Sequence, residues 1–240
     1  MSTKSGADPT SETVIELENV SHSYRARGAN FEHGEHKVLD GVSFSVHRGE
    51  TLGIIGRNGA GKTTLLRLMA GILAPRRGAI RRAPGLRCSL LSLGLGFKND
   101  LSGRDNARLS ALLQGADRAQ AEECLDRVND FAELGASFYE PVKTYSAGMR
   151  ARLGFATALQ TKVDVLLIDE VLSVGDRQFG KKAAAAMKAH ISGVQTVVLV
   201  SHVEDQLKNL CSRAVLLDGG RLAGEGGPAV VLGAYGTGAG

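Results

Sequence analysis

Tryptophan is absent from the 240-residue chain, and only 5% of the residues are aromatic. The three cysteines, Cys88, Cys124 and Cys211, are odd in number and far apart, and no C-x-x-C pair occurs. This argues against a disulfide framework or a zinc site and favours a reducing compartment. No apolar run approaches the roughly 20 residues of a membrane helix, and the first residues lack the apolar stretch of a secretion signal. We therefore expect a soluble protein that would need a partner to act at a membrane.

Net charge is also small, at +4 with a pI of about 9.0, and no block of five or six like charges occurs. This balance favours anionic partners, including phosphates, nucleic acids and membrane surfaces, without selecting one of them. Glycine is abundant at 31 residues, and 43% of the chain is hydrophobic. The length allows one large domain, or a core domain with a subdomain.

Apolar patterning predicts alternating strands and helices. Half-buried strands are predicted at residues 14–24 and 38–46, and buried ones at 51–56, 163–169, 196–200 and 214–218. Apolar residues at helical spacing follow the strand at 51–56 and recur over 105–134 and 146–160. In the stretch 105–134, Leu109, Leu112 and Leu113 are expected on one face, which Leu125, Val128 and Phe131 continue. This alternation predicts an α/β fold with a parallel sheet.

The sequence GRNGAGKT at residues 56–63 fits G-x-x-x-x-G-K-[ST] and lies between a predicted strand and a predicted helix. Glycines allow consecutive backbone N–H groups to surround a polyphosphate, and the helix N-terminus adds partial positive charge. Lys62 would reach the β- and γ-phosphates, and the Thr63 hydroxyl would bind Mg²⁺. The residues expected to contact a nucleotide here are Gly56, Arg57, Asn58, Gly59, Ala60, Gly61, Lys62, Thr63 and Thr64.

Two further strands end in polar residues. In VLLIDE (165–170), Asp169 would complete the Mg²⁺ shell and Glu170 would orient or deprotonate the attacking water. An apolar strand that ends in Asp-Glu is common in proteins and is not specific by itself. In a chain that also has a phosphate loop, it indicates a second part of the same site. In VLVSH (198–202), His202 is either a cap or surface residue or a contact to the γ-phosphate.

The segment YSAGM at 145–149 resembles the LSGGQ signature of ABC transporters, with Tyr145, Ala147 and Met149 as departures. The order Lys62, Ser146, Asp169, His202 is also that family's order. Over roughly residues 13–225 the chain therefore resembles an ABC ATP-binding cassette. The resemblance implies a P-loop NTPase fold with a RecA-like parallel-sheet core, an antiparallel β subdomain and a helical signature subdomain at about 98–160.

The resemblance also implies roles for further residues. Two copies would stack head to tail, so that Ser146, Ala147 and Gly148 face the ATP of the other copy. Asp176, in LSVGD, resembles the D-loop aspartate. Tyr24 resembles the aromatic residue that stacks on adenine, although it could equally be a core residue. Arg150 and Arg152 are either phosphate-steering residues or part of a solvated face.

Longer phrases, such as LLIDEVLSVGDRQFGKK and FAELGASFYEPVKTYS, resemble the subgroup that exports capsular polysaccharide, O-antigen or teichoic acid. This implies an ATPase subunit that is peripheral to the cytoplasmic face of a bacterial inner membrane, with a separate membrane channel and a lipid-linked polysaccharide as substrate. We expect residues 1–12 to be a disordered lead and 226–240 a short tail without a carbohydrate-binding domain. The family's glutamine after the phosphate loop is missing, and Ser92 is the residue nearest its place.

Two other functions use the same motifs. One is an ATP-operated switch that regulates a membrane complex without transport, and the other is an ABC ATPase that acts on ribosomes or DNA. The arginines are expected to form a solvated face or an anionic contact; they are Arg76, Arg77, Arg81, Arg82 and Arg87. Because no aromatic residues interleave with them, single-stranded nucleic acid is disfavoured, and we expect no nucleic-acid partner.

Overall fold

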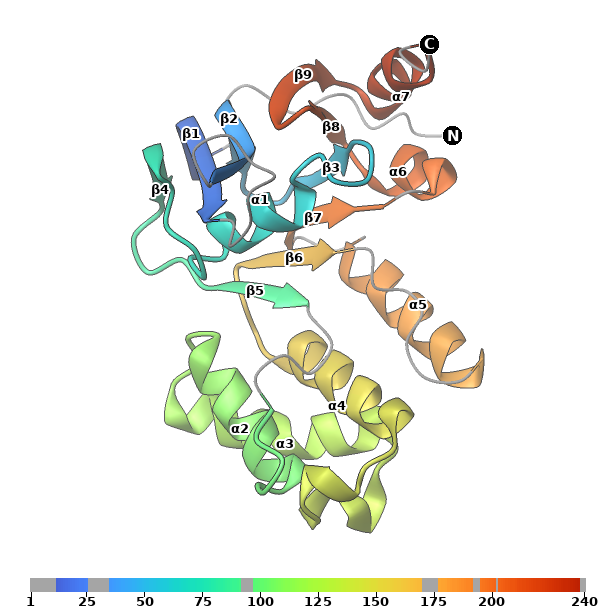
Figure 1. Ribbon diagram of the computed structural model, residues 1–240. Coiled ribbons are helices and arrows are strands. Elements are labelled where there is room, and N and C mark those ends of the chain that lie inside the picture. Colours follow the sequence, from blue (N-terminus) through green and yellow to red (C-terminus); the bar gives the residue numbers. More distant parts are fainter. Residues whose placement is uncertain are drawn as a thin grey trace. The chain divides into compact units, whose positions relative to one another are not determined.

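The computed structural model describes residues 12–25, 35–91, 97–169, 177–191, 195–201 and 203–237. The chain divides into two compact units, Met1–Leu86 with Val194–Gly240, and Arg87–Gly193. The first unit contains two sheets, and the second contains most of the helices (Figure 1). Among the helices in the described ranges, none has both the length and the apolar character needed to span a bilayer.

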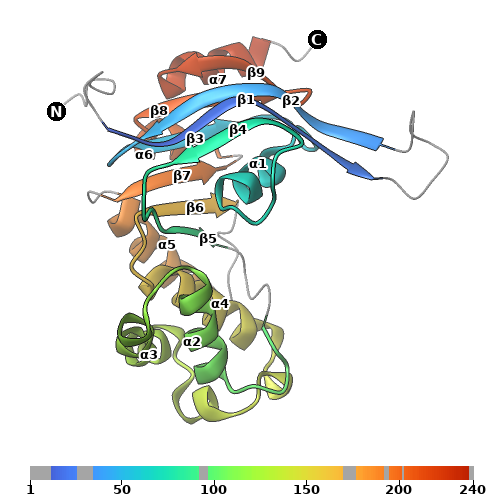
Figure 2. The ribbon, with the colours of Figure 1, turned by 90° about the vertical axis from the view of Figure 1, so that its left-hand side faces the viewer.

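One sheet of the first unit is antiparallel and has the strand order β2-β1-β4 (Figure 2). Its strands are β1 (Thr13–Arg25), β2 (Glu35–His47) and β4 (Arg77–Arg82). Its buried residues include Ile15, Leu17 and Val42. The sequence did not predict β4, because arginine side chains take three of its six positions and hide the apolar alternation.

The second sheet of this unit has β3 (Thr51–Ile55) between β7 (Thr196–Val200) and β8 (Arg213–Asp218), both parallel to it. An antiparallel strand, β9 (Arg221–Gly226), pairs with β8. Every residue of β3 and β7 is buried, which explains why these strands read as continuous apolar runs. The helices of the unit are α1 (Lys62–Met69), α6 (Glu204–Leu210) and α7 (Pro228–Thr237), and α7 packs on β8 and α6.

The second unit combines a parallel pair of strands, β5 (Cys88–Leu91) and β6 (Val165–Asp169), with a helical bundle. The α-helices are α2 (Gly103–Leu113), α3 (Arg118–Ala132), α4 (Ala147–Gln160) and α5 (Arg177–Ile191). Two 3-10 turns, η2 (Gly135–Tyr139) and η3 (Val142–Thr144), lie before α4. Leu125, Phe138 and Leu153 belong to the core that α2, α3 and α4 share.

The helix predicted over 105–134 is in fact two helices. Its later apolar residues, Leu125 and Val128, are buried as predicted, but the face predicted for its first part is wrong. Gly115 adopts a left-handed conformation with φ of 90°, and Asp117 then starts α3 with a capping box. On α2, Ala107 and Ala111 are fully buried, whereas Leu113 is 79% exposed. Small side chains allow α2 to approach α3 and α4 closely, so the alanines take the inner face.

Other predictions are confirmed. The helix predicted from 146 to 160 is α4, with Ser146 as its N-cap and Leu153, Ala156 and Leu159 buried. The three cysteines are free, as expected, and burial raises the pKa of Cys211 to about 12. This thiol is therefore a packing group rather than a reactive one.

Candidate nucleotide-binding site

The phosphate loop joins β3 to α1, and two of its glycines are required by the space around them. A Cβ atom on Gly56 would lie 2.3 Å from the carbonyl oxygen of Leu217. Gly61 has a φ of 98°, and a Cβ there would lie 2.9 Å from the carbonyl oxygen of Val38. The loop therefore passes so close to neighbouring backbone that only glycine fits at both positions.

Helix α1 begins directly after this loop. Its N-cap, Gly61, has no side chain to cap the first turn, and the first backbone bond of the helix runs from the N–H of Leu65 to the carbonyl of Gly61 at 2.9 Å. The first N–H groups of any helix have no intrahelical acceptor and carry partial positive charge. Lys62, which is 8% exposed, donates to the carbonyls of Gly56 at 2.7 Å and Arg57 at 3.0 Å. This arrangement suits a polyphosphate.

Tyr24 lies near the end of β1 and contacts the same helix. Its hydroxyl is 3.2 Å from the Oγ1 of Thr64, the third residue of α1. The side chain is half-buried. The first unit therefore brings Tyr24 together with the phosphate-loop helix.

The predicted catalytic and metal residues divide into those the structure describes and those it does not. Asp169 is the last residue of β6, after four buried apolar residues, and belongs to the second unit. Thr63 is exposed in the first turn of α1. The remaining predicted residues, Glu170, Asp176 and His202, lie outside the described residues, as does Ser92.

The signature segment forms the N-terminus of α4 in the second unit. Ser146 is the N-cap, and its hydroxyl oxygen accepts a hydrogen bond from the N–H of Met149 at 3.1 Å. Ser146 and Ala147 are exposed. A Cβ atom on Gly148 would meet only the Ser146 hydroxyl, at 3.8 Å. The positive end of α4 thus faces outward from its own unit.

Comparison with known proteins decides the family. A family model described as ABC transporter matches residues 39–173, which is more than half of the chain. The chain belongs to the ABC transporter family. The matched range includes the phosphate loop, the signature segment and Asp169, and nucleotide binding goes with this family.

Three curated relatives show how far this similarity extends. The cassette is 42% identical to the ABC transporter protein AbcA of Aeromonas salmonicida over 83% of this chain and 64% of that protein. It is 40% identical to the O-antigen export system ATP-binding protein RfbB of Klebsiella pneumoniae, over 77% of this chain and 75% of that one. It is 35% identical to the teichoic acids export ATP-binding protein TagH of Bacillus anthracis, over 87% and 40%. The aligned part of this chain thus covers between 40% and 75% of the length of these relatives.

Solved structures support the same fold. One described as the ATP-binding subunit of an ABC transporter has a TM-score of 0.73 and 24% identity, over 93% of this chain and 94% of that chain. A dimeric ATP-binding cassette in a post-hydrolysis state with ADP and Pi has a TM-score of 0.70 and 21% identity, over 89% and 98%. These likenesses confirm the predicted α/β cassette fold, with its parallel-sheet core, antiparallel sheet and helical part.

Within the cassette, the signature is anchored by a residue that departs from the family pattern. Tyr145 is 6% exposed, and its hydroxyl donates to the carbonyl of Ser137 at 2.5 Å. Burial raises the pKa of its phenol, so the group stays protonated and remains a donor. The sequence comparison with LSGGQ marked Tyr145 only as a substitution of leucine, whereas the structure gives it an anchoring hydrogen bond.

The residues before α2 are hydrogen-bonded to the segment that leads into the signature. The N–H of Lys143 donates to the carbonyl of Asn99, and that of Val142 to Leu101, each at 2.9 Å. Asn106, 1% exposed, donates to three carbonyls of residues 98–102 and accepts from the N–H of Lys98. Sequence reasoning missed Asn106; an asparagine in the first turn of a helix was its only signal.

Arg150 and Arg152 are bound within the second unit, so neither of the two predicted alternatives describes them fully. Arg150 donates to the side chain of Asn99 at 2.9 Å. Arg152 pairs with Glu133 at 3.7 Å and lies 5.2 Å from the centre of the Phe179 ring. Both side chains fix the N-terminal half of α4 to its own unit.

Most of the arginine cluster is also engaged within its own unit. Arg81 pairs with Glu16 and Glu18, and Arg82 donates to the carbonyls of Leu68 and Met69 at the end of α1. Arg87 pairs with Asp164. Three of the five arginines are thus bound to groups of their own unit, which makes the cluster less available for an anionic contact.

Proposed function

We propose that the cassette binds and hydrolyses ATP and thereby powers the export of a lipid-linked polysaccharide through a separate membrane channel. The observation that carries the ATP part is the phosphate loop, where two glycines, the open start of α1 and Lys62 converge. The polysaccharide part is supported by relatives named for O-antigen and teichoic acid export.

We assign the roles of individual residues from their charge, from the positions of those that the structure describes, and, for the others, from the resemblance to the family. Lys62 and the first N–H groups of α1 would neutralise the β- and γ-phosphates, and Tyr24 would stack on adenine. Thr63 and Asp169 offer oxygen ligands for Mg²⁺, whose charge would stabilise the transferring phosphoryl group. Glu170 would orient or deprotonate water, with His202 at the γ-phosphate and Asp176 as the D-loop residue.

The proposed site is shared between two copies of the chain. The signature's positive helix end, with Ser146 and Ala147 exposed, suits a phosphate brought by another molecule. A cassette with one phosphate loop and one signature would make two equivalent sites by pairing with two-fold symmetry. We place this dimer at the cytoplasmic face of the inner membrane, bound to the channel subunit.

Two variants test the ATPase proposal. Lys62→Ala should lose nucleotide binding, measured by isothermal titration with ATP and Mg²⁺; unchanged affinity would refute the role of the phosphate loop.

Glu170→Gln should keep ATP binding but lose nearly all hydrolysis and accumulate an ATP-bound dimer, seen as a shift in size-exclusion elution. Normal turnover in this variant would remove Glu170 from the proposed role.

The export proposal needs a separate experiment. Deleting the gene should abolish one surface polysaccharide and leave its lipid-linked precursor inside the cell. The membrane protein that copurifies with the cassette should then be a channel subunit. An unchanged surface polysaccharide, or copurification with a regulator that has a large extracellular domain, would instead support the ATP-operated switch.

A further inference from the structure

His22 lies two residues before Tyr24 on β1, so both side chains point to the same side of the strand. The imidazole is 7% exposed, and its Nδ1 lies 3.1 Å from the carbonyl oxygen of Ala74, in the segment that follows α1. Because a carbonyl oxygen can only accept, Nδ1 carries the hydrogen in this contact. The backbone after α1 therefore fixes the imidazole ring.

The imidazole in turn contacts the ring of Tyr24. The two ring centres are 5.0 Å apart and the ring planes meet at 79°, the edge-to-face geometry that aromatic pairs favour. At the other end of the phenol, the Tyr24 hydroxyl lies 3.2 Å from the Oγ1 of Thr64. The Tyr24 ring is thus held at two points, and both supports are tied to α1 or to the segment after it.

We infer that His22 is a positioning residue for nucleotide binding, which sets the plane of the Tyr24 ring before ATP arrives. This inference rests on the proposed function, in which Tyr24 stacks on adenine. A ring that is already fixed loses less conformational freedom on binding than a mobile one, so the ligand binds more tightly. His22 acts through Tyr24 and not on the phosphates. Its contribution therefore belongs to ATP affinity and not to the chemical step.

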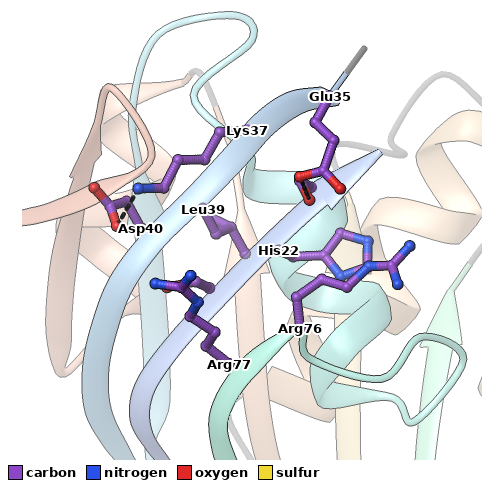
Figure 3. Close-up of a pocket in the computed structure, with 9 residues that line it drawn as sticks. His22, Glu35, Lys37, Leu39, Asp40, Arg76 and Arg77 are labelled. Carbon is purple, nitrogen blue, oxygen red and sulfur yellow. Dashed lines mark hydrogen bonds and ion pairs between the residues drawn. The ribbon is translucent and has the colours of Figure 1, made fainter. Parts of the chain in front are cut away.

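Truncation of His22 should leave the chain folded. Its imidazole lies at one end of a cavity of about 290 Å³, together with Glu35 and Arg76, whereas Lys37 and Asp40 lie at the other end (Figure 3). The space left by an alanine would join this polar cavity, where water can occupy it. A closed apolar void, which would destabilise the strand, is therefore not created.

The test compares ATP, which carries an adenine base, with a polyphosphate that has no nucleobase. Isothermal titration would measure the Kd of His22→Ala for ATP with Mg²⁺ and for inorganic tripolyphosphate, which reaches only the phosphate loop. We expect the Kd for ATP to rise about three- to tenfold, the loss expected for one aromatic contact, and the Kd for tripolyphosphate to stay within about twofold. In steady-state hydrolysis, KM should rise while kcat is retained.

Two comparisons complete the test. Ser23→Ala, next on the strand, removes a hydroxyl that lines the same cavity but donates to Glu35 and not to Tyr24 or Ala74; it should leave both Kd values unchanged. His22→Ala should add nothing in a Tyr24→Ala background. An unchanged ATP affinity in His22→Ala, or an equal loss for tripolyphosphate, would overturn the inference. Should His22→Ala not fold, His22→Leu fills the space with neither the ring edge nor the bond to Ala74, and a wild-type Kd for it would also count against the inference. If the unaltered cassette binds neither ligand, the proposed function fails instead.

Discussion

Glu50 and Arg213 form a buried ion pair in the first unit. Arg213 donates from Nη2 to one carboxylate oxygen at 2.8 Å and from Nε to the other at 3.1 Å. The Glu50 side chain is 4% exposed and the Arg213 side chain is 13% exposed. Burial lowers the pKa of Arg213, but the Glu50 and Glu225 carboxylates raise it above its ordinary value. The guanidinium therefore stays charged at neutral pH and links β8 to the residue that precedes β3.

Breaking this pair from the arginine side should destabilise the cassette. Arg213→Met would leave the Glu50 carboxylate buried without its cation, and we expect the free energy of unfolding to fall by about 3 kcal/mol. Urea unfolding followed by circular dichroism would measure this. Arg221→Met is the matched control, since Arg221 is 73% exposed in its pair with Asp40 and should contribute little. Equal losses in both variants would contradict the importance of burial.

At the residue scale, sequence could predict the phosphate loop but not the residues that support it. The loop depends on neighbours in sequence, and its glycines and Lys62 therefore form a motif. His22 is held by the carbonyl of Ala74, which lies 52 residues away, and no local pattern encodes such a contact. Arg150 likewise finds Asn99, 51 residues away, and so its role could not be chosen from sequence.

At the scale of elements, the anchoring of the signature helix depends on the start of α2. Gly103, the first residue of α2, donates from its N–H to the carbonyl of Glu140 at 3.1 Å. A Cβ atom there would lie 2.2 Å from the Tyr145 hydroxyl oxygen and 3.0 Å from the carbonyl oxygen of Phe138. The tyrosine of the signature therefore requires a glycine at the helix start.

This requirement predicts a coupled pair of substitutions. Gly103→Ala should cost about 2 kcal/mol by overpacking, and Tyr145→Phe about 1 kcal/mol by loss of its hydrogen bond. In the double variant the clashing oxygen is gone, so the cost should be smaller than the sum of the two. Urea unfolding of the four proteins would measure the coupling. Gly233→Ala on α7, where a Cβ meets nothing within 4 Å, is the control; additive costs would contradict the contact.

Elements with a clear periodic or continuous apolar pattern could be predicted from the sequence. Features that depend on a single turn residue or on packing against neighbouring elements could not. Helix α4 and strands β3 and β7 carry clear periodic or continuous apolar patterns, which their burial explains. The break between α2 and α3 depends on a single left-handed glycine, Gly115. Burial of Ala107 in place of Leu113 depends on how closely α2 packs in the bundle, which the spacing of leucines does not encode.

At the scale of the whole molecule, the proposed site needs the phosphate loop of one copy and the signature of another. Ser146→Asp should separate the two roles of this residue. Aspartate is as good an N-cap as serine, so α4 should remain intact, but its carboxylate would repel the partner's γ-phosphate. We expect ATP affinity close to that of the unaltered chain and hydrolysis reduced at least about a hundredfold. Ser146→Asn, a neutral cap, is the control for helix capping and should be affected less.

Mixing two inactive variants would then show whether the site is shared. A Lys62→Ala chain keeps its signature, and a Ser146→Asp chain keeps its phosphate loop. In a symmetric dimer, each mixed pair has one intact site and one with both defects. Random pairing at equal concentrations makes about half of the dimers mixed, so hydrolysis should return to about a quarter of the unaltered rate if the sites act independently. A site confined to one chain would give no recovery of hydrolysis at any mixing ratio. If both variants fold and form dimers, that result would exclude the shared site.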